Sequence, residues 1–164
     1  MQHMATQIRT LQPGDIGWII SMHGEVYARE FNFNMDFEAG IARKAALICE
    51  SDDTFNCVWI KEVDGQRAGS IAVSRQDDGA AFINFVLVLD EYRGQGFALE
   101  LMQHLIAYVR DAGIKTIRLE TYTCLQHARV MYKNLGFRIV SSKKNCHRFG
   151  LVLEQEYWEL ELDD

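Results

Sequence analysis

The sequence has one proline, no long apolar run and no basic excess, and each absence excludes a class of protein. Pro13 is the only proline, so no proline-rich linker divides the 164 residues, a length typical of one domain. The longest nearly continuous apolar run, residues 80–89, is far shorter than the roughly 18 residues of a membrane span. The 17 basic residues are outnumbered by 23 acidic ones, whereas a general nucleic-acid-binding protein is usually basic. We therefore expect neither a nucleic acid nor a membrane as a partner.

Cysteine is sparse and scattered. Cys49, Cys57, Cys124 and Cys146 form no C-x-x-C pair and have no histidine at metal-ligand spacing. This pattern predicts neither a zinc site nor a disulfide framework. The first ten residues, MQHMATQIRT, also lack the apolar core of a signal peptide. We therefore expect a cytoplasmic protein without a metal.

What the sequence does contain is a composition typical of one globular domain, with 48% hydrophobic and 24% charged residues. The whole acidic excess lies in residues 154–164, because residues 1–153 carry 17 charges of each sign. The short basic run of Lys143, Lys144 and Arg148 is interpreted as a solvated loop. We expect a single domain over residues 1–164.

Apolar spacing and turn residues predict the order β-α-α-β-β-β-α-β-α-β-β. Helices are expected at residues 16–31, 36–50, 99–112 and 125–135, the first with Asp15 as its N-cap. Strands are expected at residues 8–11, 57–63, 68–73, 80–89, 116–122, 137–140 and 151–162. Asp64-Gly65 indicates a hairpin, although we do not expect the ideal two-residue turn. The order predicts an α/β fold with a mixed sheet and helices packed on it.

The most informative segment is a glycine-rich turn, residues 93–98, between an apolar strand and a helix. Gly94 and Gly96 lack the Cβ atoms that would keep an anion away from the backbone. The start of the helix adds unpaired N–H donors and the positive end of the helix dipole. The turn can therefore bind a phosphate without a lysine.

Three interpretations of this turn compete. A P-loop needs Gly-Lys-Ser/Thr, which the turn lacks. A dinucleotide-binding fingerprint needs a third small residue where Leu99 stands and a chain that starts as βαβ, and both are missing. The third interpretation is a tight turn that binds nothing. A second segment of the sequence decides whether the turn binds a phosphate or is a tight turn that binds nothing.

Two motifs about 30 residues apart supply that evidence, Arg93-x-x-Gly96-x-Ala98 and Ala128-x-x-x-Tyr132-x-x-x-Gly136-Phe137. They resemble the two signatures of the GNAT superfamily of acyl-CoA-dependent N-acetyltransferases, and the element order extends this resemblance over residues 8–162. Shorter stretches resemble the acetyltransferase half of proteins fused to a MarR-type DNA-binding domain, although no such domain is present here. They include Pro13-Gly14-Asp15-Ile16-Gly17-Trp18, Arg148-Phe149-Gly150 and Gln155-x-x-Trp158.

The resemblance implies a GNAT fold, a largely antiparallel sheet of about seven strands with four helices, splayed between the fourth and fifth strands. It implies acetyl-CoA as cosubstrate, bound between residues 83–89 and 116–122. The pantetheine and thioester are then expected at the backbone of Val86, Leu87 and Val88. The pyrophosphate is expected mainly at the backbone of Gly94, Gln95, Gly96, Phe97, Ala98 and Leu99, with the side chain of Arg93 as an additional contact. The family's usual asparagine is replaced by Leu125, so its contact with CoA is lost or passes to Gln126.

For catalysis the resemblance implies that Tyr132 is the general acid, and its alternative is a plain core tyrosine. A phenol has a pKa of about 10 and a thiol one of about 8.5, so Tyr132 helps only if its pKa is lowered or it acts early. Residues 82–85 lack the glutamate that many relatives carry. Glu120 is the candidate base, and an exposed strand carboxylate is the equally weighted alternative. Cys124 is interpreted as a packed thiol rather than as a nucleophile.

The acceptor is expected near a polar face of the first helix formed by His23, Tyr27 and Glu30, where His23 has the alternative of a buried core histidine. The predicted function is transfer of an acetyl group from acetyl-CoA to a primary amine of a small molecule, peptide or protein. The alternative is a non-catalytic acyl-CoA-binding regulatory module. A homodimer is one of the partners that the sequence allows. If residues 154–164 border the acceptor cleft, they favour a cationic amine.

Overall fold

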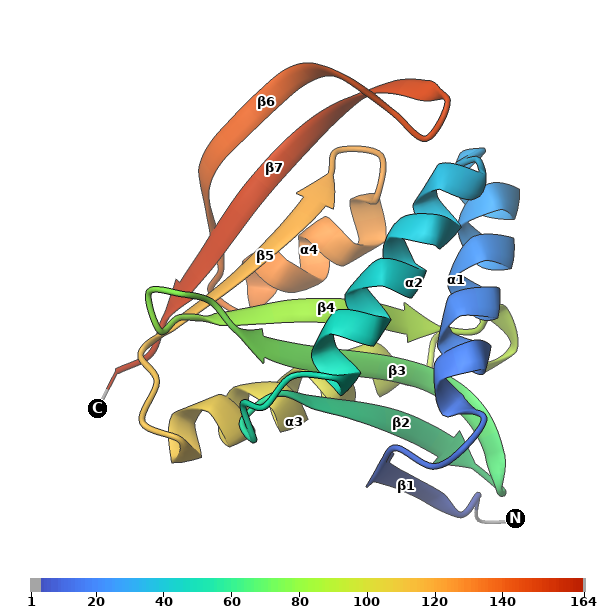
Figure 1. The fold of residues 1–164 in the computed structure, drawn as a ribbon, viewed down its shortest axis with the longest axis vertical. Helices are drawn as coiled ribbons and strands as arrows, with labels where there is room; N and C mark the ends of the chain where they lie inside the picture. The colour runs from blue at the N-terminus through green and yellow to red at the C-terminus, as the bar shows by residue number, and fades with distance from the viewer. Residues whose placement is uncertain (1–3, 164) are drawn as a thin grey trace.

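The computed structural model describes residues 4–163, which form a seven-stranded sheet and four α-helices (Figure 1). The strands are β1 (Thr6–Thr10), β2 (Cys57–Val63), β3 (Gln66–Arg75), β4 (Ala81–Val88), β5 (Thr116–Tyr122), β6 (Arg138–Arg148) and β7 (Leu151–Glu161). The helices are α1 (Asp15–Phe31), α2 (Met35–Cys49), α3 (Phe97–Asp111) and α4 (Gln126–Asn134), and a 3₁₀ turn, η1, covers Asp90–Tyr92. The predicted order of elements and fold class are confirmed.

Three local expectations differ from the structure. The linker of the β2–β3 hairpin is the two-residue turn Asp64-Gly65, because Val63 pairs with Gln66 and both turn residues have positive φ, 50° and 77°. Strand β6 extends to Arg148, so Lys143 and Lys144 lie in an edge strand rather than in a loop.

Asp15 does not cap α1, since Gly14 is the N-cap residue and no side chain caps the helix. The buried Asp15 carboxylate instead accepts hydrogen bonds from Arg9, Arg67 and the Gln12 N–H. Burial alone would raise the pKa of Asp15, but these donors outweigh it and lower the pKa to about 2. The residue ties the start of α1 to β1 and β3.

The sheet order is β1-β2-β3-β4-β5-β7-β6, and β4–β5 is its only parallel pair within residues 4–163. These two strands pair only at Ala81–Ile117 and Phe82–Arg118. Beyond Phe82 they diverge, so the backbone of each strand lacks a strand partner across the gap. The predicted splay between the fourth and fifth strands is confirmed.

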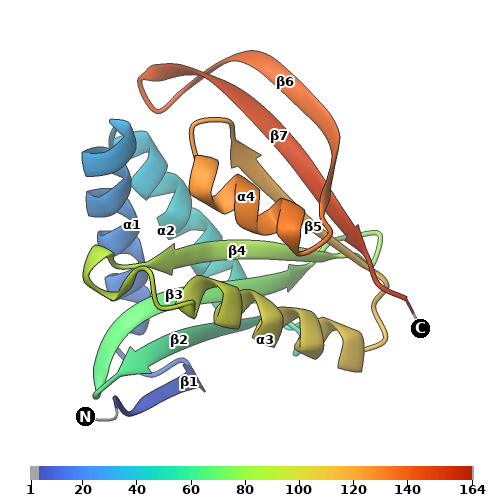
Figure 2. The same cartoon turned by 180° about the vertical axis from the view of Figure 1, so that it is seen from behind.

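Helices cover both faces of the sheet. Helices α1 and α2 lie on one face, and α3 and α4 lie on the other (Figures 1 and 2). Each face has its own apolar cluster, one around Ile19, Ile41 and Ile60 and a larger one around Leu101, Leu105 and Ile117. The split between β4 and β5 therefore opens between two packed layers.

An ion pair between the buried Lys61 and the half-exposed Glu100 fixes the first turn of α3. The Lys61 side chain is fully buried, its ammonium lies 2.6 Å from a Glu100 carboxylate oxygen, and it stands 4.7 Å from the centre of the Phe97 ring. Removing the Glu100 carboxylate would leave the Lys61 ammonium as an uncompensated charge in the interior. The helix start that follows the glycine turn is thus held against β2.

Candidate active site

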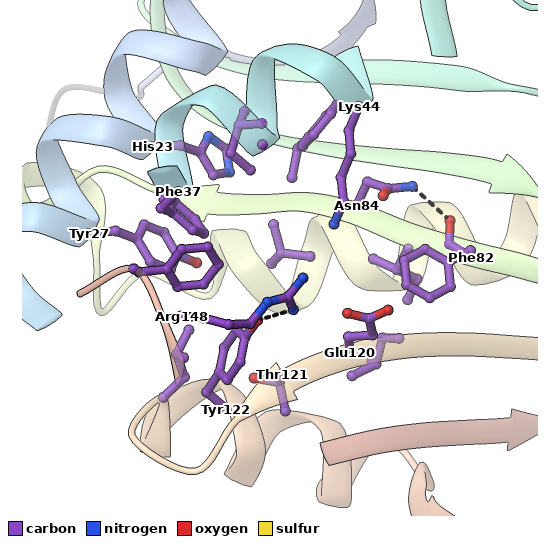
Figure 3. A pocket seen from close by; sticks show the side chains of 18 of the residues that line it. His23, Tyr27, Phe37, Lys44, Phe82, Asn84, Glu120, Thr121, Tyr122 and Arg148 are labelled. Carbon is purple, nitrogen blue, oxygen red and sulfur yellow. Dashed lines mark hydrogen bonds between the residues drawn. The ribbon is translucent and has the colours of Figure 1, made fainter. Parts of the chain in front are cut away.

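A cleft of about 360 Å³ opens where β4 and β5 part. Its walls come from five segments: α1, α2, β4, β5 with α4, and the hairpin between β6 and β7. Figure 3 shows the side chains of these segments around one opening. His23, Tyr27, Val86, Glu120 and Tyr132 are all among the lining residues. The predicted catalytic pair and two of the three predicted acceptor residues are therefore brought together.

Strand β4 bends at a bulge beside this cleft. Phe85 has a φ of 58°, a left-handed conformation that is unusual for an aromatic residue. The Ser70 hydroxyl donates a 2.6 Å hydrogen bond to the Phe85 carbonyl, and the β3–β4 register shifts between Ser70 and Ala72. The bulge turns the backbone of the next residues, beginning with Val86, along the open gap.

The glycine turn precedes α3, with Gly94 and Gly96 at φ values of 79° and 80°. A Cβ added at either glycine would meet no atom within 4 Å, so both project into open space. Within the described residues, the backbone N–H groups from Gly94 to Leu99 have no hydrogen-bond partner. The residues present therefore fit a phosphate group, which would bind to backbone donors.

The Arg93 side chain points away from these donors. Its Nε donates to the Val88 carbonyl at 3.1 Å, and its guanidinium pairs with Glu30 and Asp90. Arg93 thus braces the turn against α1. Glu30 is occupied by this ion pair and is not among the residues that line the cleft.

Tyr132 is buried in the larger core cluster and also lines the cleft. Its ring lies 6.0 Å from Phe137 and 6.1 Å from Trp158 between centres. Its hydroxyl has no hydrogen bond to another described residue and is open to the cleft. Burial raises the pKa of Tyr132, and the nearby Tyr27 adds to this, so the phenol keeps its proton at every physiological pH.

Glu120 stands on β5 and lines the same cleft. Gln155 of β7 donates a hydrogen bond of 2.8 Å to one carboxylate oxygen of Glu120, and the Tyr157 hydroxyl donates to the Gln155 amide oxygen at 3.2 Å. The amide orients the carboxylate and leaves its second oxygen free to face the cleft (Figure 3). Such an arrangement suits a base that takes a proton from a bound ligand.

His23 is buried, and its Nδ1–H donates to the Ile19 carbonyl at 2.7 Å. The neutral ring therefore carries no proton on Nε2, and this buried nitrogen has no partner among the described residues. The His23 ring stacks 5.8 Å from Tyr27. Burial raises the pKa of Tyr27 to about 12, so both residues line the cleft as neutral groups.

Lowering the pH should destabilise the protein through His23. Burial lowers the pKa of His23 to about 4. The hydrogen bond to the Ile19 backbone works in the opposite direction but does not outweigh burial. The unfolded chain takes up a proton there at about 6.5, so stability is lost as the pH falls from 6.5 towards 4. Between pH 7 and 5 we expect a loss of about 2 kcal/mol in chemical denaturation. A His23→Gln variant should lose this dependence and His104→Gln should keep most of it; an unchanged dependence in His23→Gln would contradict the assignment.

Other predicted positions lie outside the cleft. Gln126 begins α4 at the surface, and Cys124 is an exposed free thiol whose pKa is raised by partial burial. Residues 154–163 do not line the cleft. Glu159 pairs with Arg118, and Glu161 accepts from Thr116, at the end of β5 away from the opening. The condition under which the acidic segment would favour a cationic amine is therefore not met by residues 154–163.

A family model for the acetyltransferase (GNAT) family matches residues 24–137. The chain belongs to the acetyltransferase (GNAT) family. The match spans the bulged strand, the glycine turn and both sequence signatures.

Curated relatives are N-acetyltransferases. N-acetylaspartate synthetase from Danio rerio is 29% identical over 111 residues, which are 65% of this chain and 39% of that protein. N-acetyltransferase 8B from Mus musculus is 31% identical over 109 residues, which are 63% of this chain and 43% of that protein. The chain spans about two-fifths of the length of these relatives.

Solved GNAT structures show the same fold. An N-acetyltransferase from Staphylococcus aureus Mu50 matches with a TM-score of 0.81 at 16% identity, over 97% of this chain and 99% of that one. An acetyltransferase from Salmonella typhimurium with its cofactor acetyl-CoA matches with a TM-score of 0.79 at 17% identity, over 98% and 95%. No helix within residues 4–163 is long and apolar enough to cross a membrane, and no group of metal-ligating side chains was found in the same residues.

Sequence reasoning assigned no site role to several residues that line the GNAT cleft. Lys44 comes from α2, Asn84 from the bulged part of β4 and Arg148 from the end of β6. Lys44 carried no sequence signal, because many exposed helix positions hold a lysine. Arg148 did carry one, since it begins the Arg148-Phe149-Gly150 stretch, but its position in the cleft follows from a strand longer than the pattern predicts.

Proposed function

We propose that this protein transfers the acetyl group of acetyl-CoA to a primary amine by direct attack. The observation that carries the proposal is the meeting of an unpaired phenol, Tyr132, and an oriented carboxylate, Glu120, in the cleft between the diverging strands. The glycine turn lies next to the same split, at the carboxyl end of β4. A tight turn without a ligand would not require this arrangement.

The donor is held mainly by backbone in this proposal. The pantetheine and the thioester lie along Val86, Leu87 and Val88, whose backbone has no strand partner across the gap. The pyrophosphate binds the N–H groups from Gly94 to Leu99, and α3 adds the positive end of its dipole. Gln126, at the start of α4 on the other side of the gap, contacts CoA in place of the family's asparagine.

The donor supplies an activated thioester: the acceptor nitrogen forms a bond to the carbonyl carbon, the C–S bond breaks, and the proton that the nitrogen loses passes through Glu120 and solvent water to the departing thiolate. Glu120 takes that proton from the nitrogen, directly or through one water. Because burial raises the pKa of Tyr132, full proton transfer from this phenol to the sulfur would be uphill. Tyr132 therefore acts as a hydrogen-bond donor while negative charge develops on the sulfur.

Removing the base should reduce turnover strongly at neutral pH. We expect Glu120→Gln to lower kcat/KM about 100-fold or more, measured as thiol release from acetyl-CoA with a panel of amines. The loss should shrink at high pH, where the free amine needs no base. The matched control is Glu161→Gln on β7, which should keep wild-type rates; equal rates for Glu120→Gln and wild type would contradict the role of Glu120.

The same assay separates the enzyme from the alternative, a non-catalytic acyl-CoA-binding regulatory module. Tight CoA binding without turnover on any amine would support the regulatory module. We place the acceptor, a small molecule, peptide or protein amine, against His23 and Tyr27. The name of the N-acetylaspartate synthetase relative supports an amino-acid acceptor.

Further proposals concern the setting of the protein. We propose that residues 1–164 form a single N-acetyltransferase domain and that the protein is cytoplasmic, which its four free cysteines support. The kinship with MarR–GNAT fusion proteins rests only on the short stretches that include Arg148-Phe149-Gly150. The proposed homodimer rests on no contact in the structure. Sedimentation of the purified chain would test it.

A further inference from the structure

The acceptor side of the cleft carries cations that no carboxylate neutralises. Arg43 and Lys44 of α2 and Arg148 of β6 line the cleft together with only two acidic residues, Asp36 and Glu120. Within residues 4–163, none of the three cations forms an ion pair. A binding surface for a simple amine would not gather unpaired positive charge, because the amine itself arrives as a cation.

Arg148 is held in place by neutral groups. Its Nη1 donates a 2.8 Å hydrogen bond to the Tyr122 hydroxyl, and its guanidinium lies 5.5 Å from the centre of the Phe149 ring. Phe149 is fixed in turn, because its ring packs against Phe33 and Phe37 at 4.9 and 5.2 Å between centres. The remaining N–H groups of a rigid guanidinium fork are therefore left for a ligand.

Lys44, Arg148 and Glu120 point into one opening from three different elements (Figure 3). The ammonium of Lys44 and the guanidinium of Arg148 supply positive charge, and the free oxygen of Glu120 supplies negative charge. None of these groups pairs with another among the described residues. Such a separation of charge complements a ligand that carries an anion and an amine on one small skeleton.

We infer that the acceptor is an amino acid or a similar amino carboxylate, with its carboxylate bound by Arg148 and Lys44 and its amine at Glu120. This inference rests on the proposed function and narrows its acceptor class. The walls between the charged groups are largely aromatic, with Tyr27, Phe37 and Phe149 facing the cleft. They offer the side chain of such an acceptor apolar surface.

The first test compares the twenty amino acids with their decarboxylated amines, as substrates of the wild-type chain in the thiol-release assay. We expect turnover of at least one amino acid, with kcat/KM about 100-fold above that of its decarboxylated amine. A preference for amines without a carboxylate, or for peptides with an amidated C-terminus, would overturn the inference and leave the proposed function standing. Absence of turnover on every amino acid and amine would overturn the inference, whereas the proposed function would fail only if peptide amines gave no turnover either.

The second test removes the anion partner. With the best amino acid, Arg148→Met should raise KM about 30-fold and reduce the preference for the amino acid over its decarboxylated amine by a similar factor. Arg148→Lys should recover part of the loss, and Lys44→Met should shift KM in the same direction if Arg148→Met fails to fold. Arg138→Met, on the exposed part of β6, is the matched control. Equal losses for the amino acid and its amine in Arg148→Met would overturn the inference.

Discussion

Replacing Gly96 by valine should weaken the binding of CoA by about 100-fold or more. The expected pyrophosphate site consists of backbone N–H groups, and a Cβ at Gly96 would project into the open space where the phosphate must lie. Two lost charge-assisted hydrogen bonds at about 1.5 kcal/mol each correspond to roughly this change in affinity. Isothermal titration with CoA measures it directly.

The control for this variant must carry the same backbone penalty. Valine at a positive φ costs stability wherever it stands, so a partly unfolded variant could imitate lost binding. Gly113 ends the same helix with a φ of 76°, against 80° for Gly96, and its Cβ position is equally open. Gly113→Val should lose similar stability and keep wild-type affinity. Equal affinities in the two variants would remove the phosphate from the glycine turn.

Replacing Tyr132 by phenylalanine should lower kcat about 100-fold while the affinity for CoA stays within about twofold. The ring contacts with Phe137 and Trp158 do not need the hydroxyl, and this hydroxyl has no hydrogen bond to another described residue. Folding stability should therefore be unchanged or slightly higher. Steady-state turnover rates test the expected fall in kcat, and denaturation midpoints of the same preparation test the expected stability.

A matched variant at Tyr108 should lose stability and keep its turnover rate. The Tyr108 hydroxyl donates a 2.7 Å hydrogen bond to the Phe55 carbonyl, far from the cleft. Tyr108→Phe should cost about 1 kcal/mol of stability and leave kcat unchanged. If Tyr132→Phe instead loses stability and keeps its rate, Tyr132 is only the core tyrosine that the sequence left as an alternative.

The elements of this fold could be predicted from the sequence where one face of each is apolar. Helix α3 and strand β5 carry such a face, and their predicted limits agree with the structure within two residues. The predicted range of strand β6 was too short because β6 is an edge strand, with ten of its eleven residues exposed. Without a buried face the alternation of polar and apolar residues disappears.

Some features of the candidate site could likewise be predicted from local sequence, and others could not. Spacing within one segment predicted the glycine turn and placed Tyr132 on its helix, because both are local properties of the chain. The buried Asp15 and the cleft position of Arg148 depend on partners far away in the sequence, Arg67 for the first and Tyr122 for the second. Such pairings follow from the assembled sheet, and no local pattern announces them.

The short pairing between β4 and β5 has a consequence for the life of the protein in the cell. Only two residue pairs join the described parts of these strands directly, so beyond Phe82 their two inner edges are unpaired in the structure. A bound donor whose amides bond both edges would close the sheet and suppress local opening. Protection of these strands from hydrogen exchange and from proteases would then follow the supply of acetyl-CoA, and the abundance of the enzyme would rise and fall with its own substrate.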